Sequence, residues 1–250
     1  MARSCPVAFA SLIAAGFACI GQAAAGPKRC APASLAVAVD VGHTLSSPGA
    51  TSARGEPEFA FNQELARSVL AELNAAGFHR SFLIGESGSP LPLLERTRTA
   101  MQRGAGLFIS IHHDSVQPRY LTDWQAGGRT QRYSDRFRGF SLFISGETAR
   151  LEDSKDLAGL IGRALLAAGF TPSLHHAEQI PGEGRPLLDG GIGLYRYDQL
   201  AVLRTAAMPA VLLEAGIIVN REEEAQSRQP SVLRTKAQAI ARAVGQFCAG

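Results

Sequence analysis

Several features that define other classes of protein are scarce in this sequence. Four cysteines in 250 residues are too few for a disulfide-rich scaffold. Basic and acidic residues nearly balance, at 25 and 22, so the net charge of +3 does not indicate a nucleic-acid-binding protein. No internal repeat, low-complexity tract or interdomain linker interrupts the chain. With 46% hydrophobic residues, the chain is expected to form one globular domain rather than a disordered one.

The N-terminal segment has the pattern of a secretory signal peptide. An early cation, Arg3, precedes an apolar stretch over residues 6–20, and a run of small residues ends at Ala25. The apolar stretch is shorter than the roughly 20 residues that span a bilayer, which disfavours a stable membrane anchor. We expect residues 1–25 to be removed and residues 26–250 to be exported, to the periplasm or otherwise to the exterior.

Removal of this segment would take away Cys5 and Cys19 and leave one cysteine near each end of the mature chain. The termini of single domains often lie close together, and an exported protein meets an oxidising compartment. A disulfide between Cys30 and Cys248 is therefore one expectation. Two unpaired thiols in the terminal tails are the alternative.

Strand-like and helix-like segments alternate along the rest of the chain. Apolar runs predict buried strands at residues 35–41, 81–85, 107–111, 140–145 and 210–216. Amphipathic patterns and glycine stops predict helices at residues 58–77, 93–104, 154–169 and 231–247. This alternation predicts a single α/β domain, with a mostly parallel or mixed twisted sheet covered by helices on both faces.

Residues 115–138 fit neither pattern. They contain five arginines, the single tryptophan Trp124 and the pair Gly127-Gly128. Long loops in compact domains are usually functional or mobile. We expect an inserted basic loop here, with a cover over an active site or a substrate-contacting rim as alternatives.

Three predicted strand ends carry residues suited to catalysis. The first strand runs into Asp40 and His43, and Glu58 opens the helix that follows. Another strand ends in His112-His113, and Glu214 lies inside the last apolar run. Ligands of open α/β sheets bind outside the carboxyl ends of the strands, so these side chains are placed to converge.

Two histidines and one carboxylate are a ligand set of catalytic zinc, which keeps a fourth position open for water. A further carboxylate beside that water would act as a general base, and an unpaired Glu214 in an apolar run would otherwise be costly. Each residue also has an ordinary interpretation: His43 as a loop residue bonded to the backbone, and Glu58 as a charge at a helix N-terminus. The residues alone do not separate His112 from His113.

Three segments together resemble the zinc-dependent N-acetylmuramoyl-L-alanine amidases of the amidase 3 family. Residues 37–66 carry the family's Asp-x-Gly-His turn and its Gly-x-x-Glu motif with Asn four residues later. Residues 93–115 carry its Leu-x-x-Arg helix and Ser-x-His strand end, and residues 200–224 carry its Pro-x-x-Leu-x-Glu motif. The matching positions are Asp40, Gly42, His43, Gly49, Ala50, Gly55, Glu58, Asn62, Arg96, Ser110, His112, Asp114, Pro209, Leu212, Glu214 and Asn220.

The resemblance implies that His43, Glu58 and His112 ligate one Zn²⁺ ion and that Glu214 is the catalytic base. It covers residues 35–247, and the three motifs occur in the family's order.

Other positions are settled by the resemblance or depart from it. Glu58 is preferred to Glu56 because only Glu58 has Asn62 at the family's spacing. Thr44-Leu45 stands where the family commonly has glycines, which makes the rim beside the metal bulkier. The pair His175-His176 has no partner at a suggestive spacing, and we interpret it as a surface loop pair.

The implied activity is hydrolysis of the amide between N-acetylmuramic acid and the L-alanine of the peptidoglycan stem peptide. The alternatives are a zinc peptidase acting within the stem peptide and a catalytically inactive wall-binding or regulatory relative. We expect a monomer whose ligand is peptidoglycan, with no nucleic-acid partner. An activator protein would be needed if residues 115–138 covered the site.

Overall fold

The computed structural model describes residues 1–2 and 29–250. Nearly all of the expected signal peptide, with its cleavage site after Ala25, lies outside the described residues, as do Cys5 and Cys19. Within the described part of the chain, no helix is both long and apolar enough to cross a bilayer.

A seven-stranded sheet forms the centre of the domain, in the order β2-β1-β3-β9-β6-β8-β7. The first four of these strands are mutually parallel, and β6 and β8 run antiparallel to β9. The sheet is therefore mixed and mostly parallel, as the sequence predicts. Its strands are β1 (Val37–Val41), β2 (Phe82–Ile84), β3 (Leu107–Asp114), β6 (Ser141–Ile144), β7 (Leu187–Asp189), β8 (Leu194–Arg196) and β9 (Ala210–Ile217).

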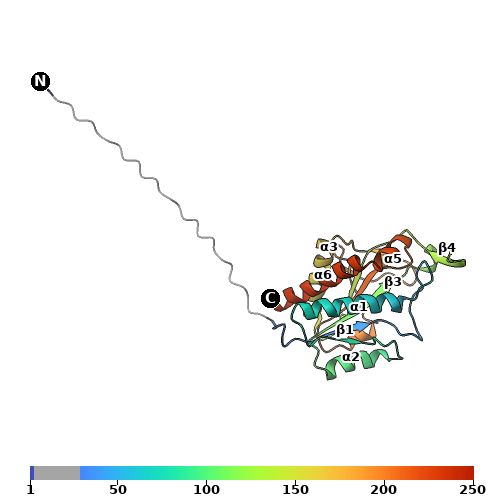
Figure 1. The fold of residues 1–250 in the computed structure, drawn as a ribbon, viewed down its shortest axis with the longest axis horizontal. Coiled ribbons are helices and arrows are strands. Elements are labelled where there is room, and N and C mark those ends of the chain that lie inside the picture. Colours follow the sequence, from blue (N-terminus) through green and yellow to red (C-terminus); the bar gives the residue numbers. More distant parts are fainter. Residues whose placement is uncertain (3–28) are drawn as a thin grey trace.

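Helices cover both faces of the sheet (Figure 1). On one face α1 (Glu58–Ala75), α3 (Leu151–Ala167) and α6 (Pro230–Ala249) pack together, and on the other lie α2 (Leu93–Gln102) and the short α4 (Ala201–Arg204). A further short helix, α5 (Arg221–Ser227), follows β9. Alternate residues of β1 enter the two cores, because successive side chains of a strand point to opposite faces. The predicted single α/β domain with helices on both faces is confirmed.

A disulfide joins the two ends of the domain. Cys30 and Cys248 are bonded, with their Cα atoms 4.6 Å apart across a sequence separation of 218 residues. The backbone N–H of Arg29 also donates to the carbonyl of Cys248 at 2.9 Å. Of the two expectations for these cysteines, the bridge is the one that the structure contains.

The irregular loop expected over residues 115–138 contains a β-hairpin. Its strands β4 (Thr122–Ala126) and β5 (Arg129–Tyr133) form a separate antiparallel pair. Gly127 and Gly128 have φ angles of 57° and 74°, the left-handed conformation that a tight two-residue hairpin turn requires. The indole Nε1 of Trp124 donates to the carbonyl of Ala53 at 2.7 Å, which fastens the hairpin to the loop between β1 and α1.

Candidate metal centre

His43, Glu58 and His112 lie together at the carboxyl edge of the sheet. The carboxylate of Glu58 bridges the two histidines, because its Oε2 is 3.0 Å from His43 Nε2 and its Oε1 is 3.0 Å from His112 Nδ1. Ligand atoms about 2.1 Å from a tetrahedrally bound zinc ion would stand roughly 3.4 Å apart, which is close to this spacing. Burial alone would raise the pKa of Glu58, but its hydrogen bonds with the two histidines lower it well below its usual value.

Two glycines leave the space that these side chains occupy. A Cβ atom on Gly42 would stand 2.3 Å from His112 Nε2, and one on Gly49 would stand 2.3 Å from Glu58 Oε2. Gly49 has a φ of +81°, and His43 itself has a φ of +70°, a left-handed conformation that is uncommon outside glycine. The turn after β1 is thus shaped around the cluster.

Further hydrogen bonds hold the Glu58 carboxylate in place. The amide of Asn62, one turn along α1, donates to Glu58 Oε1 at 3.0 Å, and the backbone N–H of Ala50 donates to Oε2 at 3.0 Å. Asn62 Oδ1 also lies 2.9 Å from His113 Nδ1. His113 is therefore buried against α1, outside the cluster, and His112 is the histidine of the pair that faces Glu58.

A buried ion pair supports the backbone of His43. Arg96 on α2 lies 2.7 Å from Asp40 Oδ1, and both side chains are almost fully buried. Arg96 also donates to the carbonyls of Val41 and His43 at 2.5 and 2.6 Å, and Ser110 on β3 donates to Asp40 Oδ2 at 2.7 Å. These contacts explain why the Leu-x-x-Arg segment accompanies the first histidine.

Glu214 lies on β9 beside His112, which is its register partner on β3. Its Oε2 is buried and has no hydrogen-bond partner among the described residues. Burial, and then the negative charges of Asp114 and Glu58, raise the pKa of Glu214 well above its usual value. This environment favours the protonated form of the Glu214 carboxyl, the form that donates a proton.

A cavity of about 620 Å³ opens beside His43 and His112. Its wall also includes Leu91, Pro92 and Leu200, so one side of the opening is apolar. None of the residues that line it belongs to the 115–138 segment.

The interpretation of His175-His176 as a surface pair is wrong. The two residues are only 3% and 8% exposed, and both rings face the carboxylate of Asp114 at the end of β3. Glu183 contacts His176 from the other side. No local pattern predicts this contact, because the segment that carries the histidines reaches β3 through tertiary packing.

The fold and the cluster together define a class: α/β proteins with a His-Glu-His cluster and an unpaired glutamate at the carboxyl edge of the sheet. Within this class, the chain belongs to the N-acetylmuramoyl-L-alanine amidase family, whose sequence model matches residues 37–246. The family resemblance carried by the three sequence motifs is thereby confirmed.

Individual relatives agree with this assignment. The chain is 28% identical over 238 residues to N-acetylmuramoyl-L-alanine amidase AmiC of Neisseria meningitidis, a match covering 84% of this chain and 52% of that protein. It is 25% identical over 237 residues to the probable amidase AmiB of Haemophilus influenzae, covering 87% of this chain and 53% of that protein. The chain thus spans about half the length of these curated relatives.

Solved structures show the same fold. The amidase Ami1 from Mycobacterium smegmatis superposes with a TM-score of 0.66 at 24% identity, covering 87% of this chain and 98% of that chain. The amidase AmiC2 of Nostoc punctiforme gives a TM-score of 0.63 at 22% identity, covering 85% of this chain and 96% of that chain. At these identities the likeness establishes the fold, and the chemistry has to be argued from the site.

Proposed function

We propose that the protein is a zinc-dependent amidase that cleaves the amide between N-acetylmuramic acid and the L-alanine of the peptidoglycan stem peptide. The observation that carries this proposal is the His43-Glu58-His112 cluster with the unpaired Glu214 on the neighbouring strand. Membership of the amidase family supports the choice of substrate.

The donor set fits zinc. Two imidazole nitrogens and one carboxylate oxygen are typical ligands of catalytic Zn²⁺, and the hydrogen bond from Asn62 to Glu58 is the kind of outer contact that orients a ligand. His43, Glu58 and His112 would hold the ion. Bound there, zinc would polarise the scissile carbonyl and lower the pKa of water.

The chain's own residues account for the proton transfers. Glu214 would accept a proton from the attacking water and later deliver it to the leaving amine of the L-alanine, so that the amide becomes a carboxylic acid and a free amine. The raised pKa of Glu214 suits delivery of a proton to the amine, and its unpaired Oε2 is placed to accept one from water. The cavity beside His43 and His112 has the size of a typical small-ligand site and would receive the substrate.

The β4-β5 hairpin is proposed to be a substrate-contacting rim. It lines no part of the cavity, and its exposed residues include Arg129 and Arg132, which are suited to the carboxylates of stem peptides. Replacing both arginines with alanine is expected to raise KM for sacculi without changing zinc content. An increase in kcat instead would support a cover that requires an activator protein.

Export and a monomeric state are part of the proposal. The signal-like N-terminus and the Cys30–Cys248 bridge both fit an oxidising compartment outside the cytoplasm. Cell fractionation should recover the mature protein with the periplasmic or secreted fraction. Recovery of full-length protein in the cytoplasm would contradict export, and a dimer by light scattering would contradict the monomer.

Three variants of residues 26–250 test the catalytic roles. Glu214→Gln should keep the zinc content of the unaltered protein and lose activity on sacculi by about 10²–10⁴-fold. His43→Ala should lose both activity and one equivalent of zinc. Glu152→Gln, at an exposed carboxylate of α3, is the matched control and should change neither. Full muropeptide release by Glu214→Gln would refute its assigned role.

A further inference from the structure

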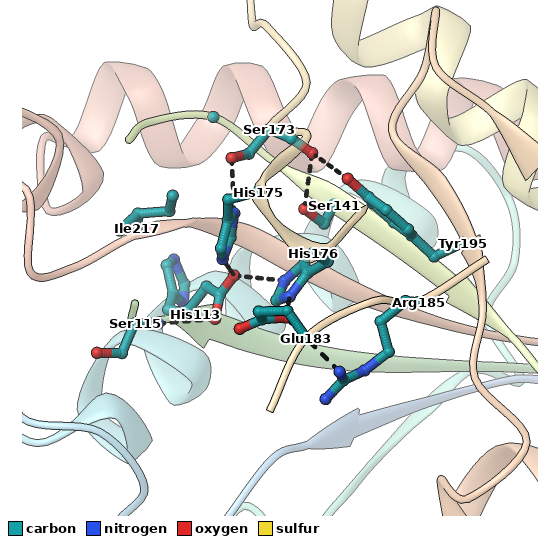
Figure 2. A network of polar contacts seen from close by, with 12 residues as sticks. His113, Ser115, Ser141, Ser173, His175, His176, Glu183, Arg185, Tyr195 and Ile217 are labelled. Atoms are coloured by element: carbon teal, nitrogen blue, oxygen red, sulfur yellow. Dashed lines mark hydrogen bonds and ion pairs between the residues drawn. The ribbon is translucent and has the colours of Figure 1, made fainter. Parts of the chain in front are cut away.

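A second group of side chains of metal-ligating types lies at the carboxyl end of β3 (Figure 2). It consists of Asp114 at the end of β3 and of His175 and His176, which form a short 3₁₀ turn. Their ligand atoms all lie within 4.8 Å of one another. The proposed amidase chemistry uses none of these three residues.

The two imidazole rings direct the same nitrogen at one carboxylate oxygen. His176 Nε2 is 2.8 Å from Asp114 Oδ2, and His175 Nε2 is 3.3 Å from the same atom. These separations match the 3.0 Å spacing in the His43-Glu58-His112 cluster. They are slightly shorter than the roughly 3.4 Å between ligands that share one tetrahedral ion, so a small movement would admit an ion.

The other ring nitrogen of each histidine, Nδ1, already lies within hydrogen-bonding distance of an oxygen atom. His175 Nδ1 lies 2.9 Å from Ser173 Oγ, and His176 Nδ1 lies 2.9 Å from Glu183 Oε2. Tyr195 donates to the carbonyl of Ser173 at 3.0 Å, which fixes that residue in turn. Metal-ligating histidines characteristically donate their other ring N–H to an oxygen, often a carboxylate, and so are oriented before the metal binds.

The contact between His175 and Asp114 is incomplete. The His175 side chain is 1% exposed, and its Nε2 lies 3.3 Å from Asp114 Oδ2 without the alignment of a hydrogen bond to any described residue. A buried polar nitrogen without a well-aligned hydrogen bond is unfavourable, and coordination to a cation would satisfy it.

The charges at the cluster also favour a divalent cation. Asp114 and Glu183 both contact His176, and Arg185 lies 3.6 Å from Glu183. Without a metal, the alternative is a protonated His176 held between the two carboxylates. Burial lowers and these carboxylates raise the pKa of His176, which on balance reaches about 9. In that ion triad the buried Nε2 of His175 has only its 3.3 Å contact with Asp114, whereas a shared metal ion would bind it directly.

We propose that Asp114, His175 and His176 bind a second divalent ion, Zn²⁺, which fastens the segment 172–186 to the end of β3. Two imidazoles and one carboxylate are a donor set that zinc accepts. Asp114 and His176 keep 14% and 10% of their side chains exposed, so water can reach a fourth position. This site is structural and does not depend on the catalytic role proposed for the first cluster.

The test removes the first cluster and asks whether a metal still binds. Residues 26–250 carrying His43→Ala and His112→Ala are stripped with a chelator, equilibrated with Zn²⁺ and measured by mass spectrometry for bound metal. We expect one equivalent, and none when His175→Gln is added. His79→Gln, at an exposed histidine, is the matched control and should leave the single equivalent unchanged.

Two further measurements keep the test decisive. Zn²⁺ should raise the unfolding temperature of the double variant and leave that of the triple variant unchanged, with circular dichroism verifying that each is folded. If the double variant does not fold, the unaltered protein is used, and it should bind two equivalents. Zero equivalents in the folded double variant would overturn the second site, as would a single equivalent in the unaltered protein that persists when His175→Gln is introduced. A single equivalent in the unaltered protein that is lost with His175→Gln would instead refute only the catalytic zinc.

Discussion

The buried ion pair beneath His43 gives a prediction whose size follows from the structure. Arg96→Met keeps a long side chain but removes the guanidinium that pairs with Asp40 at 2.7 Å and donates to two backbone carbonyls. Both partners are at least 98% buried, so the Asp40 carboxylate would be left without its counter-charge. Breaking a buried pair in this way costs about 3–5 kcal/mol of unfolding free energy.

For a domain of this size, such a loss lowers the unfolding temperature by roughly 6–20 °C, at about 2–4 °C per kcal/mol. Calorimetry or denaturant unfolding of the disulfide-bonded protein measures it. Arg98→Met on the same helix is the control, because Arg98 pairs with Glu95 at the surface and should cost less than about 1 kcal/mol.

Arg96→Met should also weaken zinc binding at the first cluster by about 10–100-fold, because the carbonyl of His43 loses its donor. A change in stability no larger than that of Arg98→Met would refute the reasoning. Unchanged zinc affinity alongside lost stability would show that the ion pair supports the fold but does not position His43.

Three more predictions concern other parts of the molecule. Gly49→Ala should weaken zinc binding at least tenfold in a chelator competition, because its Cβ would collide with the Glu58 carboxylate. Unchanged affinity would show that the turn at Gly49 does not constrain Glu58. Replacing Cys30 and Cys248 with serine should lower the free energy of unfolding by up to about 5 kcal/mol, because the disulfide closes a loop spanning 218 residues and so restricts the unfolded chain. Denaturant unfolding measures this loss, and a loss below about 1 kcal/mol would count against a stabilising disulfide. Burial lowers the pKa of Lys236 to about 8, so the folded state loses this proton before the unfolded state does. Stability should therefore rise from pH 8 to pH 10 by about 2 kcal/mol relative to Lys236→Met, and parallel pH profiles would contradict this.

The strands that the sequence predicts are those buried on both faces. Leu35–Val41 and Ala210–Gly216 are continuous apolar runs, and the structure places β1 and β9 there. The hairpin over residues 122–133 was not predicted, because its strands are polar and half exposed and carry no apolar periodicity. The three-residue strand β7 is exposed throughout, and its two leucines are too short a run to predict a strand.

The candidate site shows the same division between local and tertiary information. His43 and Glu58 are recognisable because they follow a buried strand and open a helix. Local sequence does not tell which of His112 and His113 faces Glu58, because a register shift between His112 and Asp114 interrupts the regular alternation of side chains along the strand. The burial of His175-His176 depends on packing across the sheet edge, which the residues around it do not encode.

The identity of the product tests the central claim most directly. Purified sacculi digested with residues 26–250 should release stem peptides that begin with a free L-alanine amine, and the glycan should keep intact N-acetylmuramic acid lactyl groups, both identified by mass spectrometry. The release should stop on chelation and return with Zn²⁺. Fragments cut within the stem peptide, or no release from zinc-loaded protein, would contradict the account.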